Sequence, residues 1–335
     1  MKRSLAVGHF YNEPFQSACA PWLDRIAEVF FAWPGVLSCR PAPEFTPEVR
    51  ARLMSDLHWC RDNGIRLDTL FNCLCYGDIS VSTELADFVT RTLGEMDREG
   101  LFPDVVTTTS PFIASIVKSR FPSVRIRASV NMRIHGTIGF EALGDLFDEY
   151  YISREYQRNL DYVDTIAKWC HEHGKLIGAQ ANSGCLRQCP FQTFHDNLHG
   201  HNRIRQSKVG EQFDFDIFRC RTHYTKERKI IDFLRSTWLR PEDIPLWEER
   251  LDLIKLATRR TPHPTEILNA YASYHYDGNL IRLMDPHYED AFAPGIVDNR
   301  LFPNDWATSG IAADCANNCT NCGRCETIWK TIYHS

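Results

Sequence analysis

The 335-residue sequence lacks several features that would assign it at once to a class of protein. It contains no run of about 18 consecutive apolar residues, so we expect no transmembrane helix and no membrane partner. Its basic N-terminus is followed by an apolar run too short for a secretory signal, which predicts a cytoplasmic protein. Basic residues are not in excess, because the formal net charge is −5. RNA is therefore not favoured as a partner.

Common nucleotide-binding and hydrolase motifs are also absent. The sequence has no glycine-rich dinucleotide fingerprint, no P-loop and no G-x-S-x-G nucleophile elbow. It has no internal repeat at solenoid periods and no low-complexity tract. The length and the hydrophobic fraction of 43% are instead typical of a globular chain with one large domain or two smaller ones.

Short apolar segments alternate with amphipathic segments along most of the chain. The predicted strands are residues 5–10, 36–39, 67–73, 104–108, 125–130, 149–153, 176–181, 237–239 and 251–257. Between them, residues 46–63 and 84–99 carry apolar side chains every three or four positions, which predicts helices. Repeated strand–helix units predict an α/β fold with a parallel sheet. About eight or nine strands without a dinucleotide fingerprint favour a (β/α) TIM-barrel-like domain over a doubly wound sheet.

The alternation breaks in two places, which sets the expected domain organisation. Residues 182–236 form an irregular cysteine-rich insertion directly after a predicted strand, at the barrel end where active sites are built. From residue 285 onward the chain is rich in Pro, Asp and Asn and ends in a cysteine cluster. We therefore expect a barrel domain over residues 1–284, insertion included, and a C-terminal extension over residues 285–335.

Cysteine is the unusually abundant residue, with 13 in the chain. In a reducing compartment, clustered thiols indicate metal ligands or catalytic groups rather than disulfides. The tail carries four in a C-x3-C-x2-C-x2-C pattern: Cys315, Cys319, Cys322 and Cys325. Four thiolates at this spacing suit an iron–sulfur cluster or a structural zinc ion. The spacing leaves both open, with a redox relay of free thiols as a third alternative.

A second cysteine group lies in the insertion and consists of Cys185, Cys189 and Cys220. Cys189 precedes a proline, as in many iron–sulfur ligand runs. Three thiolates are an incomplete set, so a fourth ligand must come from elsewhere. Cys73 and Cys75, at the end of a predicted strand, could supply it, or both could be small buried hydrophobes. The isolated cysteines are expected to be packing residues: Cys19, Cys39, Cys60 and Cys170.

Two histidines of the insertion, His195 and His199, are four residues apart and would share one helix face. The segment lacks the glutamate of an H-E-x-x-H metalloprotease motif. We therefore expect His195 to contact substrate or transfer protons rather than to bind metal, with a solvated loop as the alternative.

Seven short segments, taken together, resemble the U32 family of collagenase-like peptidases. They are residues 72–77, 128–131, 152–155, 182–191, 239–243, 254–261 and 280–286. Each segment is short, but their order and spacing follow the family from about Leu67 onward. The resemblance implies a barrel-like catalytic domain that holds an oxygen-sensitive [4Fe-4S] cluster. It also implies relatives that hydroxylate ubiquinone precursors or RNA bases without O2, some of them as heterodimers, with prephenate implicated as the oxygen donor.

The resemblance also implies roles for particular residues. Cys185, Cys189 and Cys220 match the family's core cluster cysteines, and Cys75 matches the cysteine of its N-terminal element, which makes Cys75 the expected fourth ligand. Arg154 matches the arginine of the family's S-R-E segment. The gap between Cys185 and Cys189 is shorter than in the quinone and RNA members, and the four-cysteine tail is not part of their pattern. The substrate is therefore not transferred.

We accordingly expect an iron–sulfur oxidoreductase or hydroxylase that acts on a small molecule or a peptide. Arg154 would bind a carboxylate, such as that of a prephenate-like oxygen donor, or else form an ion pair at the barrel mouth. Asn72 and Asn131 would bind substrate, and Asn182 and His195 would join Arg154 at the catalytic centre. Capped strand ends are the alternative for the asparagines. Two other functions stay open: a cluster-bearing electron-transfer subunit of a heteromeric enzyme, and a true peptidase.

Overall fold

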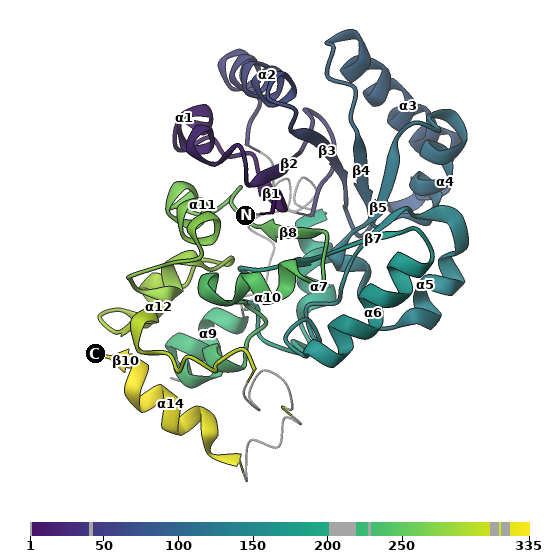
Figure 1. The fold of residues 1–335 in the computed structure, drawn as a ribbon. Helices are drawn as coiled ribbons and strands as arrows, with labels where there is room; N and C mark the ends of the chain where they lie inside the picture. Colours follow the sequence, from purple (N-terminus) through teal and green to yellow (C-terminus); the bar gives the residue numbers. More distant parts are fainter. Residues whose placement is uncertain (1, 40–42, 201–218, 227–228, 309–314, 316–321) are drawn as a thin grey trace, which may run out of the picture.

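The computed structural model describes residues 2–39, 43–200, 219–226, 229–308, 315 and 322–335. Eight parallel strands in sequential order close into a barrel (Figure 1). The strands are β1 (Leu5–Gly8), β2 (Ile26–Phe31), β3 (Arg66–Phe71), β4 (Val105–Thr108), β5 (Arg125–Ala128), β6 (Glu149–Tyr151), β7 (Leu176–Gln180) and β8 (Leu253–Leu256). The predicted (β/α) TIM-barrel-like fold is confirmed.

The strand prediction was wrong at two segments and missed one strand of the barrel. Residues 36–39 belong to the irregular connection that follows β2. Residues 237–239 lie beside the end of β7, where the Leu239 amide donates to the Ala181 carbonyl without extending the sheet. The prediction missed β2 because Glu28 interrupts its apolar run. The carboxylate of Glu28 is inside the barrel, where it meets arginines from other strands.

Helices surround the barrel on the outside (Figure 1). They are α1 (Phe15–Cys19), α2 (Pro47–Asp62), α3 (Thr83–Arg98), α4 (Pro111–Arg120), α5 (Thr137–Leu143), α6 (Leu160–Glu172), α7 (Gln192–Gly200), α9 (Arg219–Thr225), α10 (Ile244–Glu248), α11 (Pro264–Ser273), α12 (Glu289–Phe292) and α14 (Arg324–Ile332). The predicted helices at α2 and α3 are confirmed. Each begins at a hydroxyl cap, because Thr46 and Ser82 accept hydrogen bonds from backbone amides of the first turn.

The apolar core lies mainly between the outer face of the barrel and the helices. The apolar side chains of the barrel interior form a separate small cluster of Ala6, Phe30 and Leu70. The remaining interior is polar and charged. Because successive residues of a strand face opposite sides, a charge at an inward position inside an apolar strand marks this polar interior.

Arg127 of β5 is the centre of a buried ionic network inside the barrel. Its guanidinium is fully buried and pairs with Glu28 of β2, Asp68 of β3 and Glu149 of β6. The Arg127 Nη2 atom lies 2.7 Å from Glu28 Oε2, and Nη1 lies 3.1 Å from Asp68 Oδ2. Burial alone would raise the pKa of Glu149, but Arg127 and Arg66 outweigh it and hold that pKa below its usual range. The network joins four strands of the barrel.

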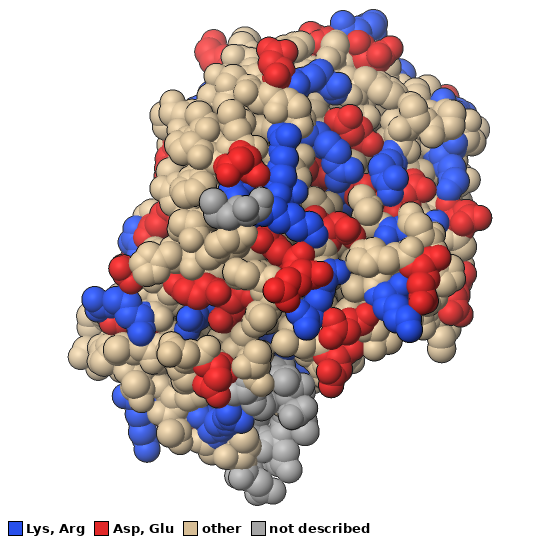
Figure 2. All heavy atoms as spheres, viewed as in Figure 1, with Lys and Arg blue, Asp and Glu red and all other residues tan. Residues whose placement is uncertain are grey.

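The C-terminal extension packs against the insertion and the segment that follows it. Its helix α14 contacts the 3-10 helix η5 (Ile230–Arg235), and the ring of Trp306 stacks on that of Trp238 with their centres 5.6 Å apart. Within the extension, strand β10 (Tyr333–His334) pairs with β9 (Ile296–Val297). Figure 2 shows acidic and basic side chains interleaved over the face that Figure 1 presents. Within the described ranges, no helix is long and apolar enough to cross a membrane.

Replacing Arg127 by methionine tests the importance of the ionic network. The change removes the one fully buried cation that three carboxylates share, so we expect the free energy of unfolding to fall by about 3–5 kcal/mol in urea denaturation. Arg66→Met is the matched control, because Arg66 also pairs with Glu28 and Glu149 but its side chain is 29% exposed. The control should lose about 1 kcal/mol. Equal losses in the two variants would contradict the central role of Arg127.

Candidate active site

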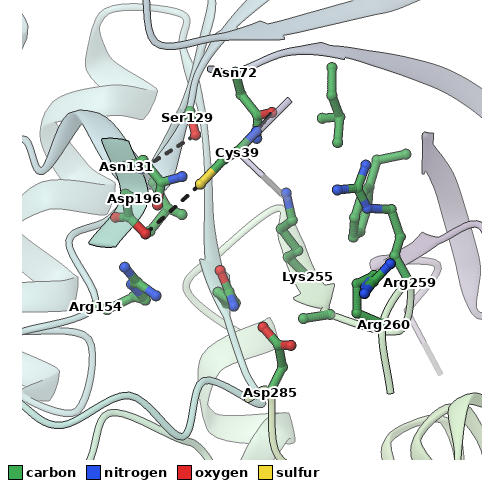
Figure 3. Close-up of a pocket in the computed structure, with 15 residues that line it drawn as sticks. Cys39, Asn72, Ser129, Asn131, Arg154, Asp196, Lys255, Arg259, Arg260 and Asp285 are labelled. Atoms are coloured by element: carbon green, nitrogen blue, oxygen red, sulfur yellow. Dashed lines mark hydrogen bonds between the residues drawn. The ribbon is translucent and has the colours of Figure 1, made fainter. Parts of the chain in front are cut away.

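A pocket that opens to solvent lies at the C-terminal ends of the barrel strands (Figure 3). Its polar lining combines strand residues with the segments that follow several strands: Cys39, Asn72, Ser129, Asn131, Arg154, Gln180, Asp196, Lys255, Arg259, Arg260 and Asp285. Phe30 and Leu70 supply apolar floor. Active sites of (β/α) barrels are built at this end, so this mouth pocket is the candidate active site.

The mouth pocket carries more positive than negative charge. Lys255 lies between Arg154 on one side and Arg259 and Arg260 on the other (Figure 3). The acidic residues of the lining are Asp196 and Asp285. Arg133, which is not part of the lining, partly neutralises Asp196. The Arg133 Nη2 atom lies 3.4 Å from Asp196 Oδ2. The balance of charge suits an anionic ligand, and the planar guanidinium groups suit a carboxylate.

Arg154 connects the mouth pocket to the cysteines of the insertion. It follows β6 and is 8% exposed, with its guanidinium in the pocket lining. Its Nη1 atom lies 3.5 Å from Ser183 Oγ and 3.6 Å from Cys185 Sγ. A ligand held by Arg154 would therefore lie next to the loop that carries Cys185.

The structure brings Cys185, Cys189 and Cys220 into one neighbourhood. Cys220, on α9, lies within electrostatic range of the other two thiols. Burial raises the pKa of Cys189 and of Cys220, so a metal that binds thiolates here would displace protons. The hydroxyl of Tyr288 lies beside Cys220, with which it interacts as a hydrogen-bond partner, and within electrostatic range of Cys185.

Cysteine thiolates are the ligands that an iron–sulfur cluster or a structural zinc ion would use. In chemical type, the residues present fit such a group. The described His, Cys, Asp and Glu side chains do not converge in groups of three that could hold a metal ion.

The loop that carries Cys185 is fixed by Asn182 and Gly184. The Oδ1 atom of Asn182 accepts from the Ala257 amide at 2.7 Å, and its Nδ2 atom donates to the Leu283 carbonyl at 2.9 Å. Asn182 is fully buried, and its contacts are those of a residue that holds the backbone. A Cβ atom on Gly184 would lie 3.2 Å from the ring of Tyr288, so this close approach favours glycine.

Cys73 and Cys75 follow β3, and their described contacts are local. The Cys73 thiol contacts the Cys75 carbonyl at 2.9 Å, and the Cys75 sulfur accepts from the Gly77 amide at 3.4 Å. Three strands separate β3 from β7 in either direction around the barrel, so the two loops start on opposite sides of the mouth. Ligation by Cys75 stays a prediction, as does ligation by Cys73.

Other predicted site residues fall at the mouth pocket or next to it. Asn72 and Asn131 line it, and Asn72 Oδ1 also accepts from the Cys39 amide at 3.1 Å. His195 lies on α7 but is not part of the lining, whereas the next residue, Asp196, is. The Oδ1 atom of Asp196 lies 3.9 Å from Cys39 Sγ. Cys39, expected to be a packing residue, is buried but also lines the pocket.

The tail cysteines are described in part. Cys315 and Cys325 lie within electrostatic range of each other and of Arg158, a buried arginine of the barrel. Cys322 is exposed, and Cys319 lies outside the described residues. The Arg235 Nη2 atom lies 2.8 Å from Glu326 Oε1, which fastens α14 to η5 next to Cys325. The choice between iron and zinc in the tail stays open.

Sequence reasoning missed Lys255, which extends from β8 into the mouth pocket. Its Nζ atom lies 4.0 Å from the ring centre of Phe30 and 5.0 Å from that of Tyr151. Burial lowers the pKa of Lys255. Burial has the opposite effect on the carboxyl group of Asp68, whose pKa it raises. Asp68 also acts on Lys255 electrostatically. The signal in the sequence that could have identified it is the single lysine within the otherwise apolar run Leu253–Leu256.

The comparisons with known proteins give two informative matches, although no family model matches the chain. The "Uncharacterized protease MJ1657" of Methanocaldococcus jannaschii is 19% identical over 310 residues, which span 90% of this chain and 87% of that protein. The solved structure of the U32 peptidase Mk0906 aligns with 76% of this chain and 92% of its own, with a TM-score of 0.54 and 14% identity. The resemblance to the U32 family is confirmed.

The U32-like chain also aligns with a glycosidase barrel, the GH53 catalytic domain of Ignisphaera aggregans. That match has a TM-score of 0.38 and 13% identity, over 76% of this chain and 84% of the other.

Replacing Asn182 by alanine separates a structural role from a catalytic one. The change removes hydrogen bonds that join the insertion to Ala257 and Leu283, and it leaves a buried amide unpaired. We expect the free energy of unfolding to fall by about 1–3 kcal/mol, measured by urea denaturation. Unchanged stability together with lost activity would instead support the catalytic role that the sequence predicts.

Proposed function

We propose that this U32-like chain is an iron–sulfur enzyme that carries out O2-independent hydroxylation, or a related redox or oxygen transfer, on a small molecule or a peptide. The observation that supports it most is the position of Arg154. This residue lines an electropositive pocket and also contacts Cys185, so an anionic ligand and a thiol-bound cluster would be neighbours.

In this proposal Cys185, Cys189 and Cys220 hold a [4Fe-4S] cluster, with Cys75 as the expected fourth ligand. When bound, the cluster would supply electrons or, at an iron without a thiolate, a Lewis acid. The buried rings of Tyr224 and Tyr288 lie beside these thiols and would limit access of water.

The residues of the mouth pocket would bind and orient the ligand. Arg154 would pair with one carboxylate through its planar fork, and Arg259 and Arg260 would receive a second anionic group. A prephenate-like dicarboxylate, acting as oxygen donor, fits this distribution of charge. Asn72, which follows β3, and Asn131, which follows β5, would fix the ligand by hydrogen bonds.

The tail supplies a second part of the proposal. Cys315 and Cys325 lie near Arg158, and burial together with the positive charge of Arg187 lowers the pKa of Arg158. Arg187 belongs to the loop between Cys185 and Cys189. A cluster in the tail would thus lie on the same side of the barrel as the core cysteines and could pass electrons from a donor or a partner subunit.

A peptidase is the second candidate, because relatives carry that name. A cysteine peptidase needs a base beside its nucleophile. Cys39 in the mouth pocket has Asp196 beside it, but no histidine belongs to the described lining. The pocket therefore supports the redox proposal better than a hydrolytic one.

Anaerobic purification with iron and sulfide analysis tests the cluster. We expect about four irons and four sulfides per cluster and a brown protein. Cys185→Ser should lose the core cluster and leave any tail cluster in place. Cys170→Ser, at a fully buried cysteine of α6, is the matched control and should retain all its iron. Stoichiometric zinc without sulfide in the wild-type protein would refute the proposal.

Arg154→Lys tests the carboxylate site. Lysine keeps the charge but loses the planar fork, so we expect a dicarboxylate to bind about 10-fold to 100-fold more weakly in titration calorimetry. Arg120→Lys, on the exposed end of α4, should leave binding unchanged. Equal affinity in the Arg154 variant and the wild type would remove Arg154 from the binding site.

A further inference from the structure

Lys255 is the least explained charged group of the mouth pocket. It is 7% exposed, and its ammonium makes no hydrogen bond or ion pair with the residues that the structure describes. Its Nζ atom instead lies over two aromatic rings, those of Phe30 and Tyr151. A buried lysine that only stabilises a fold is normally paired with a carboxylate, so this arrangement points to a ligand.

The carboxylates nearest to Lys255 in the barrel interior are engaged elsewhere. Asp68 Oδ2 accepts from Arg127 at 3.1 Å and from Thr107 at 2.8 Å. The Oδ1 atom of Asp68 is buried and has no partner among the described residues. Asp68 is also the charged group that acts most strongly on Lys255. The interior thus holds an amine that faces the pocket and a carboxyl oxygen free to exchange a proton.

The surroundings of Lys255 lower the pKa of its ammonium to about 8, which raises the fraction of free, nucleophilic amine near neutral pH. Burial disfavours the ammonium, and the positive charges of Arg127 and Arg259 add to that effect, while Asp68 and Glu28 oppose it. Amines that are desolvated or lie beside other cations are the ones that attack carbonyl groups at neutral pH. The arginines on both sides of Lys255 would hold the carboxylate of such a ligand (Figure 3).

We propose that Lys255 forms a covalent imine with an oxo acid bound in the mouth pocket. The proposal rests on the proposed function to the extent that the pocket must bind a carboxylate. The oxo group must lie above the floor made by Phe30 and Leu70, where the lysine amine points.

The step balances without any further reactant. The free amine attacks the carbonyl carbon, and a carbon–nitrogen bond forms as the carbonyl π electrons move to oxygen. The oxygen takes up protons and leaves as water when the carbon–oxygen bond breaks. The product is a protonated carbon–nitrogen double bond. Counted from the ammonium form, one water is released, because two of the three ammonium protons leave with the carbonyl oxygen.

Reductive trapping tests the proposal on the anaerobically purified protein. Pyruvate is the probe, and cyanoborohydride reduces an imine to a stable secondary amine that peptide mapping locates. We expect the adduct at Lys255 in at least tenfold excess over any other lysine, and none with lactate, which has the carboxylate but no oxo group. Lys255→Arg should lose the adduct. Lys175→Arg, at a lysine that pairs with Asp145 outside the pocket, should keep it.

Three outcomes would overturn the proposal. An adduct spread over exposed lysines such as Lys168 would show unselective reaction. Binding of both pyruvate and lactate in calorimetry without an adduct would leave the carboxylate site standing and remove only the role of Lys255. Binding of neither probe would remove the carboxylate site as well. Mapping of the wild-type protein decides these cases even if Lys255→Arg does not fold.

Discussion

The pairing of Arg127 with three buried carboxylates is the interaction on which the barrel interior depends. Glu28, Asp68 and Glu149 come from three other strands, and none could be buried as a charge without a cation among them. The guanidinium has enough donors in a fixed plane to meet all three. Apolar side chains could have filled the same space, but their contacts are not directional. The ionic layer instead fixes which strands stand opposite each other.

The ionic layer also determines what lies above it. Two residues further along β2 and β3, Phe30 and Leu70 face the same interior and form the floor of the mouth pocket. Lys255 reaches this floor from β8, and Arg154 stands at the rim next to Cys185. The site therefore has four layers along the barrel axis: the ionic layer around Arg127, the apolar floor, the cationic pocket and the loop that carries Cys185. Binding of an anion and cluster chemistry would then occur within one enclosure.

The sequence predicted the architecture well because strand–helix alternation is a local signal. It located seven of the eight barrel strands and the insertion that carries Cys185. It missed β2, and it gave no role to Asp68 or Lys255 although both lie in predicted strands. Barrel closure places these charges beside groups from strands that are distant in sequence, and local patterns do not show those partners. Asn182 shows the converse. Its position after a strand suggested chemistry, but its partners, Ala257 and Leu283, are distant in sequence and invisible to local patterns.

The central claim is that the cysteines beside Arg154 hold iron next to an anion-binding pocket. Anomalous diffraction from crystals of the anaerobically purified protein, recorded on both sides of the iron and zinc absorption edges, tests it most directly. We predict an iron signal among Cys185, Cys189 and Cys220, adjacent to the Arg154 guanidinium. A zinc signal at that position, or no metal signal with these three thiols apart, would contradict it.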